Sequence, residues 1–149
     1  MAHAESEEGW SPQGPVVELS DNASWDLLKS RNFGHLGLCT AEGPDIFPVN
    51  YYSQADTILF RTATGSKLHE LAANEQVAFE VDQETSESVW SVVARGPARV
   101  LVTDPILSEE ARATFPAWVP VQPFVYVLIE PRTIRGRRFE RHLPIITRR

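Results

Sequence analysis

Three short apolar runs follow one another between residues 33 and 62, and turn residues separate them. The runs are residues 33–40, 46–53 and 57–62. Their period-two alternation and their β-branched and aromatic content are typical of strands. The connecting segments, 41–45 and 54–56, are too short for a crossover helix, so consecutive strands must pair antiparallel. The sequence therefore predicts an antiparallel meander.

Later runs extend this β pattern. They are residues 76–81, 89–102 and 124–129, the last of which is expected to resume near residues 133–134. The 89–102 run is long and contains Gly96-Pro97, a pair that interrupts a strand ladder and favours a bend. A bent long strand is typical of a barrel. About six mostly antiparallel strands thus predict a mainly β fold, a small β-barrel with short helices.

Three short helices are expected between the strands. They span residues 20–31, 67–73 and 108–113. The first begins with N-cap oxygens at Ser20, and the second repeats Leu68 and Leu71 at helical spacing. None is long enough to form a core by itself, so the helices are expected to cover the ends of the barrel.

A single cysteine, Cys39, limits the redox and metal chemistry of the chain. One thiol can form neither an intramolecular disulfide nor a cysteine-based zinc site, which favours a reducing cytoplasm as the location. The first residues carry acids where an export signal needs a basic start and an apolar stretch. Cys39 lies inside an apolar run, so it is expected to be a buried small hydrophobe.

Charge is unevenly distributed along the chain. Fourteen Lys and Arg against twenty Asp and Glu give a net charge of −6, which argues against general attraction to nucleic acid. Residues 132–149 nevertheless carry seven arginines and a single acid, Glu140. This basic end can meet an anionic ligand, RNA or the acidic surface of a partner subunit, and a solvated basic edge is an equally open interpretation.

Residues 60–67 combine a strand end, a glycine-containing turn and a helix start. Unpaired N–H groups at a helix start favour anions. Arg61 offers a planar fork and Lys67 a point charge, which are two complementary ways of holding a phosphate. The segment is therefore a candidate phosphate site, although an ordinary capped helix with solvated cations would show the same pattern.

Five segments follow one another with a specific order and spacing. They are residues 33–37, 47–51, 60–67, 74–81 and 90–98. In that order they resemble the successive motifs of the pyridoxamine 5′-phosphate oxidase-like, FMN-binding split-barrel family. The resemblance implies a flavin-binding split-barrel domain over residues 20–138, preceded by a polar lead-in at 1–19 and followed by a basic tail at 139–149.

The resemblance also implies where a cofactor would lie, in a homodimer with FMN between the subunits. The residues that it assigns to cofactor binding are Pro48, Val49, Asn50, Arg61, Thr62, Ala63, Ser66, Lys67, Trp90, Ser91 and Val92. Arg61, Ser66 and Lys67 would hold the phosphate, and residues 48–50 would lie beside the isoalloxazine. Residues 90–92 would approach it from the partner subunit.

These features predict a cytoplasmic, homodimeric, FMN-dependent oxidoreductase that acts on an unidentified small organic substrate. The redox chemistry would belong to the flavin, so no catalytic side chain is assigned. Two alternatives stay open: an F420-dependent reductase, and a protein that binds a flavin or haem without turnover. No metal site is predicted, because His35 and His69 form no recognisable ligand spacing. Neither nucleic acid nor a membrane is an expected partner.

Overall fold

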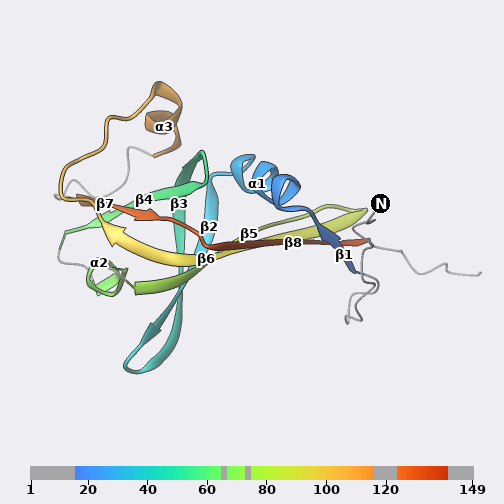
Figure 1. The fold of residues 1–149 in the computed structure, drawn as a ribbon, viewed down its shortest axis with the longest axis horizontal. Helices are drawn as coiled ribbons and strands as arrows, with labels where there is room; N and C mark the ends of the chain where they lie inside the picture. The colour runs from blue at the N-terminus through green and yellow to red at the C-terminus, as the bar shows by residue number, and fades with distance from the viewer. Residues whose placement is uncertain (1–15, 65–66, 73–74, 116–123, 141–149) are drawn as a thin grey trace, which may run out of the picture.

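The computed structural model describes residues 16–64, 67–72, 75–115 and 124–140 as a mainly β protein with three short helices (Figure 1). The strands are β1 (Val16–Leu19), β2 (Phe33–Thr40), β3 (Gly43–Gln54), β4 (Thr57–Ala63), β5 (Glu75–Glu84), β6 (Ser88–Val100), β7 (Phe124–Ile129) and β8 (Thr133–Glu140). The helices are α1 (Asp21–Lys29), α2 (Lys67–Ala72) and α3 (Glu109–Thr114).

Six of these strands close into a ring. The strands lie in the order β1-β8-β6-β5-β2-β3-β4-β7, and β6 also pairs with β7, so the ring runs through β2, β3, β4, β7, β6 and β5. Every pairing is antiparallel. Closure leaves the ring without a free edge. The predicted split barrel of about six antiparallel strands is confirmed, and β8 and β1 extend the sheet beyond the ring.

The long strand β6 changes partners at Gly96. One edge of β6 pairs with β5, while the other edge pairs with β8 over residues 88–95 and with β7 over residues 98–100. A Cβ on Gly96 would lie 2.5 Å from the carbonyl oxygen of Glu130, so the β7–β8 connection can cross here only over a glycine. The predicted interruption at Gly96-Pro97 therefore takes the form of a change of partner.

The barrel interior is filled mainly by large apolar side chains from facing strands. Tyr51, Phe60 and Phe79 are the largest fully buried ones, and each contributes about 1.5–3 kcal/mol through burial. The rings of Tyr51 and Phe79 meet edge to face, with centroids 4.9 Å apart. The Tyr51 hydroxyl donates a hydrogen bond to the carbonyl oxygen of Leu28, which ties α1 to the barrel.

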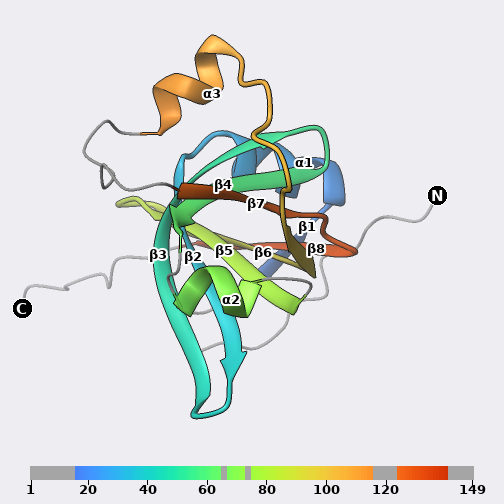
Figure 2. The same cartoon turned by 90° about the vertical axis from the view of Figure 1, so that its left-hand side faces the viewer.

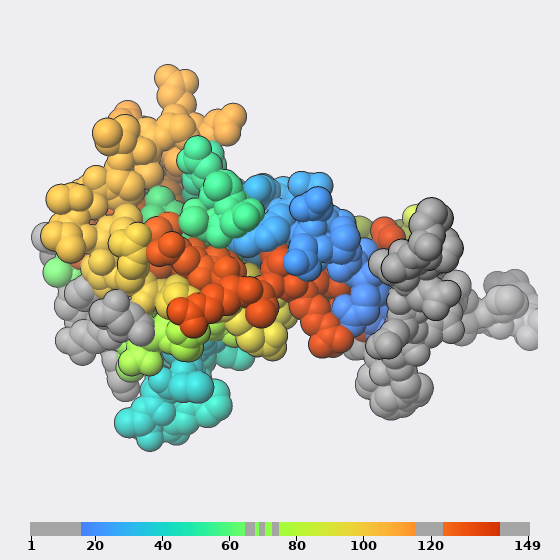
Figure 3. Space-filling view, viewed as in Figure 1, coloured from blue at the N-terminus to red at the C-terminus, as the bar shows by residue number. Residues whose placement is uncertain are grey.

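Each helix covers a different part of the sheet. Helix α2 contacts five strands of the ring, and α3 contacts β3; Figures 1 and 2 show the two helices on opposite sides of the barrel. The α3 segment and the β2–β3 hairpin both project from the body in the space-filling view (Figure 3). Ser20 caps α1 through Ala23 N, at 3.1 Å, and Ser108 caps α3 through Ala111 N, at 3.2 Å.

The sheet extends beyond the expected domain limits of 20–138. Residues 16–19 form β1, and β8 continues to Glu140. The arginines at 135, 137 and 138 therefore belong to a strand, while residues 141–149 lie outside the described part. No helix among the described residues has the length and apolar character needed to cross a bilayer.

Cys39 is exposed, and the expectation that it is a buried hydrophobe is wrong. The alternation within β2 gives the reason, because Leu36 and Leu38 point into the core and the next residue must point outward. Cys39 lies opposite Pro44 near the β2–β3 turn.

Candidate functional site

The side chains of β4 alternate between the interior and the outer face of the barrel wall. Phe60 is fully buried in the main core, whereas Leu59 belongs to a second apolar cluster. Period two places Arg61 on the outer face with Leu59, opposite Tyr126 of β7. A cation is therefore held on the outer wall of the barrel, beside the second cluster.

The guanidinium of Arg61 lies against two aromatic rings. Its central carbon is 4.5 Å from the ring centroid of Phe124 and 5.0 Å from that of Phe115, within the range of cation–π attraction. Tyr126 meets these rings edge to face, with centroid distances of 5.6 and 6.0 Å. The aromatic contacts fix the orientation of the guanidinium.

A pocket of about 460 Å³ opens beside this guanidinium. Its lining is Arg61, Asp104, Pro105, Ile106, Leu107, Arg112, Phe115 and Tyr126. Two guanidinium groups against one carboxylate leave the lining positively charged, and the aromatic rings supply flat apolar walls. This combination suits a ligand that joins an anion to a planar ring.

Those predicted cofactor-binding side chains that the structure describes divide between the two faces of the sheet. The outer face carries Pro48, Asn50, Arg61, Ala63 and Ser91, and the inner face carries Val49, Thr62, Trp90 and Val92. The division follows from period two and from the burial of neighbouring residues on each strand. Only the first group presents its side chains to a ligand on the outer wall.

On β6, Trp90 and Val92 point into the core. The exposed fraction of Trp90 is 7%, and Val92 is fully buried. Ser91 lies between them and points outward, where its hydroxyl donates to Glu80 Oε2 at 3.3 Å. In the single chain, the side chains of Trp90 and Val92 pack β6 against the main core. Ser91 is the residue of this predicted segment whose side chain is on the outer surface.

On β3, Pro48 and Asn50 occupy successive outward positions. Pro48 is exposed and lies opposite His35 of β2, and Asn50 lies opposite Phe33. The Asn50 Nδ2 donates to the carbonyl oxygen of Asn32 at 3.2 Å, so the loop before β2 orients this amide. Both residues are on the same barrel surface as Arg61 of the adjacent strand.

The predicted phosphate group of residues is only partly described. Arg61 is placed as above, and Lys67 begins α2, as predicted. Ser66 and the side chain of Lys67 lie outside the described part of the chain. The proposed convergence of all three on one phosphate remains a prediction.

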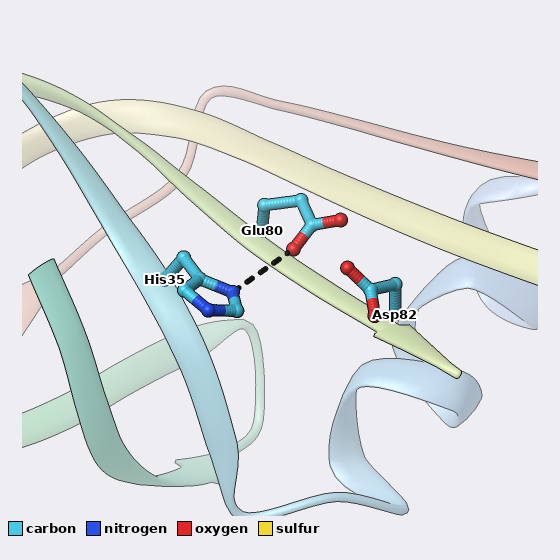
Figure 4. A group of neighbouring side chains, drawn as sticks. All are labelled: His35, Glu80 and Asp82. Atoms are coloured by element: carbon cyan, nitrogen blue, oxygen red, sulfur yellow. Dashed lines mark hydrogen bonds and ion pairs between the residues drawn. The ribbon is translucent and has the colours of Figure 1, made fainter. Parts of the chain in front are cut away.

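A cluster that sequence reasoning missed lies on the outer face of β2 and β5 (Figure 4). His35 lies opposite Glu80 in the β2–β5 ladder, with His35 Nδ1 3.4 Å from Glu80 Oε1. Asp82 is the next residue on that face of β5, and the side-chain ligand atoms of the three lie within 4.8 Å of one another. The one signal in the sequence is period two in β5, which places Glu80 and Asp82 on the same face of the strand. The contact of His35 with Glu80 arises from the register between β2 and β5.

The electrostatics of this cluster centre on Glu80. Burial, and then the neighbouring Asp82 carboxyl, raise the pKa of Glu80 to about 7, while the contacts with His35 and Ser91 act in the opposite direction. Two carboxyl groups are thus held close together on a half-buried surface. Such crowding disfavours the charged form of Glu80.

Two of the three arginines of β8, Arg135 and Arg137, bind within the chain. Arg135 forms hydrogen bonds from Nε and Nη2 to the Glu18 carboxylate, the shortest of 2.6 Å, and Arg137 Nε lies 3.5 Å from it. The hydrogen bond with Arg135 lowers the pKa of Glu18, more than partial burial raises it. Two charges of the predicted basic end therefore join β8 to β1.

The sequence matches a family profile described as pyridoxamine 5′-phosphate oxidase over residues 20–138. An uncharacterized protein of Mycobacterium tuberculosis is 40% identical over 86 residues, which cover 58% of this chain and 78% of that one.

Solved structures show the same fold. A FAD binding protein from Mycobacterium smegmatis superposes with a TM-score of 0.65 at 38% identity, covering 83% of this chain and 98% of its own. A FAD-binding protein from Mesorhizobium loti superposes with a TM-score of 0.69 over 83% of this chain and 97% of its own. Its identity is 23%, so it supports the fold alone.

Proposed function

This chain belongs to the pyridoxamine 5′-phosphate oxidase family, and on that premise we propose that it is a flavin-dependent oxidoreductase that binds FMN on the outer wall of β3 and β4. The substrate class is a small organic molecule. The site comprises the pocket beside Arg61 and the outward side chains of β3, Pro48 and Asn50.

The observation that carries this proposal is the Arg61 pocket. A buried or half-buried anion needs charge-assisted hydrogen bonds, and the guanidinium groups of Arg61 and Arg112 line one pocket of about 460 Å³. The rings of Phe115 and Phe124 hold the Arg61 guanidinium. This preorganisation lowers the entropy lost when a phosphate binds.

The outward residues of β3 would lie beside the ring of the bound cofactor. Pro48 offers a rigid apolar surface, and Asn50 offers an amide that is already oriented by Asn32. A bound flavin supplies the hydride or electron chemistry. The chain's own residues bind its phosphate, orient its ring and exclude water from one of its faces.

A second copy of the chain is proposed to cover the outer face of β2 and β3. Phe33 is 51% exposed and Ile46 is 68% exposed on that face, next to the outward Pro48. Large exposed apolar side chains of this kind mark association surfaces. A homodimer would enclose the cofactor ring between two barrel walls, because a barrel filled by its own side chains has no interior space for it.

FAD is the second candidate cofactor, because the M. smegmatis protein at 38% identity binds FAD. FMN and FAD share the phosphate and the isoalloxazine that this site is proposed to hold. F420 and haem remain the further alternatives from the sequence.

The absorption spectrum of the purified protein tests the proposal. Flavin bands are expected, and chromatography of the acid-released cofactor then identifies FMN or FAD. Deazaflavin bands would assign the F420 alternative, and a Soret band would assign haem binding. A protein without bound cofactor that also fails to bind added FMN or FAD would overturn the proposed function.

A further inference from the structure

We propose that His35, Glu80 and Asp82 form a binding site for a first-row divalent cation of the Zn²⁺ type. The site lies on the outer face of β2 and β5, so it shares β2 with the surface that a second copy is proposed to cover (Figure 4). It uses none of the residues proposed to hold the flavin phosphate.

The strand register brings the three ligands together on a rigid support. His35 and Glu80 are direct partners across the ladder, and Asp82 follows two residues later on the same strand face. All three side chains offer a ligand atom within 4.8 Å of the others. Donor atoms about 2.0–2.2 Å from a tetrahedral Zn²⁺ lie roughly 3.3–3.6 Å apart. The His35–Glu80 separation of 3.4 Å already meets this spacing, and the Asp82 carboxylate lies within 4.8 Å of both partners.

The separation of His35 Nδ1 and Glu80 Oε1 fits two ligands of one ion better than it fits a strong hydrogen bond. Its 3.4 Å separation exceeds the usual 2.7–3.2 Å of an N–H···O bond. The carboxyl groups of Glu80 and Asp82 also stand close together, at a cost that a divalent cation would remove.

The chemistry of the donor set selects the class of cation. One imidazole nitrogen and two carboxylate oxygens suit Zn²⁺, Mn²⁺, Fe²⁺ or Co²⁺, and the cluster contains no thiolate for softer ions. Three protein ligands leave at least one position for water or another donor, as in open zinc sites. The proposed site is therefore open.

A neighbouring strand supports the ligand at the centre of the site. The Ser91 hydroxyl of β6 donates to Glu80 Oε2 at 3.3 Å, while Oε1 faces His35. A hydrogen bond of this kind orients a metal-binding carboxylate and leaves its second oxygen for the ion. Ser91 is a positioning residue in this proposal.

Zn²⁺ titration of the full-length chain tests the site. The protein is treated with EDTA, desalted and titrated at pH 7.5 in competition with a chromophoric chelator. One Zn²⁺ per chain is expected. The variants His35→Gln, Glu80→Gln and Asp82→Asn should each lose more than tenfold in affinity, and Ser91→Ala about tenfold, the lower end of what an outer-shell partner contributes.

Two control variants separate this site from adventitious binding. Glu75→Gln removes a carboxylate from the other end of β5 and from its opposite face, and His3→Gln removes an imidazole from the N-terminal segment. Both should keep the wild-type affinity. Absence of saturable binding in the wild-type chain overturns the proposal, and so does equal affinity in the three ligand variants.

The spectrum of added Co²⁺ provides a second readout that needs no variant. Visible absorption of four- or five-coordinate Co²⁺ is expected with the wild-type chain and supports the site even if a variant does not fold. The spectrum of the hexaaqua ion overturns it. Neither measurement requires flavin, so failure here and failure of the proposed function are distinguishable.

Discussion

Substituting Gly96 by alanine tests how the β7–β8 connection crosses β6. A Cβ at this position would lie 2.5 Å from Glu130 O, 2.8 Å from Pro131 Cα and 2.9 Å from Arg132 N. All three are backbone atoms, so no rotamer change can relieve the contact. Two backbone hydrogen bonds hold the connection there, Glu130 N to Pro97 O at 3.1 Å and Arg132 N to Arg95 O at 2.7 Å.

The expected cost follows from these contacts. Overpacking costs about 1–3 kcal/mol, and weakening the two flanking hydrogen bonds adds about 0.5–1.5 kcal/mol each, so Gly96→Ala should lower the free energy of unfolding by about 2–6 kcal/mol. Urea unfolding at one fixed protein concentration measures this loss of free energy. The urea concentration at the midpoint should fall by about 1 M or more.

Gly37→Ala is the matched control, because the same substitution there meets only ordinary contacts. The nearest atoms to its Cβ would be Ala78 O at 3.5 Å and Ala78 Cβ at 3.8 Å. This variant should unfold within about 1 kcal/mol of the wild type. Equal urea midpoints for Gly96→Ala and Gly37→Ala would refute the argument that the crossing requires a glycine.

Three further predictions concern β1, the core and the proposed interface. Because the pKa of Glu18 is lowered by Arg135 in the folded chain, Glu18→Gln should lower the free energy of unfolding by at most about 1 kcal/mol at pH 7. The difference in unfolding free energy between Glu18→Gln and the wild type should vanish at a pH low enough to protonate wild-type Glu18. Urea unfolding at pH 7 and at that low pH measures this. Tyr51→Phe should lower the free energy of unfolding by about 0.5–1.5 kcal/mol in thermal or urea unfolding, because the buried Leu28 carbonyl loses the hydroxyl donor and keeps Arg31 N at 3.4 Å. The double substitution of Phe33 and Ile46 by Asp should shift sedimentation from dimer to monomer while the circular dichroism spectrum stays unchanged; a persistent dimer would contradict the proposed interface.

Local rules explain why the strands could be predicted from the sequence. The turn residues and period-two runs predicted β2 and β4 closely, because these strands are short and one face of each is buried. Capping oxygens predicted the start of α1 for the same local reason.

The remaining features depend on contacts between distant parts of the chain. Strand β1 has four residues and is stabilised by pairing with β8, more than a hundred residues later, so nothing local marks it. The pairing of His35 with Glu80 arises from the β2–β5 register. The prediction for Cys39 is wrong because the alternation of β2, and not the apolar content of the run, decides which side of the strand the thiol lies on.

The most direct test of the central claim is the affinity of the chain for FMN with and without the Arg61 guanidinium. Flavin fluorescence is titrated against cofactor-free wild type, Arg61→Ala and the control Arg99→Ala, whose guanidinium forms an exposed ion pair with Glu130. Loss of a charge-assisted contact of about 1.5–3 kcal/mol predicts a ten- to hundredfold weaker affinity in Arg61→Ala, with Arg99→Ala unchanged. Wild-type affinity in Arg61→Ala would contradict the placement of the flavin phosphate in this pocket.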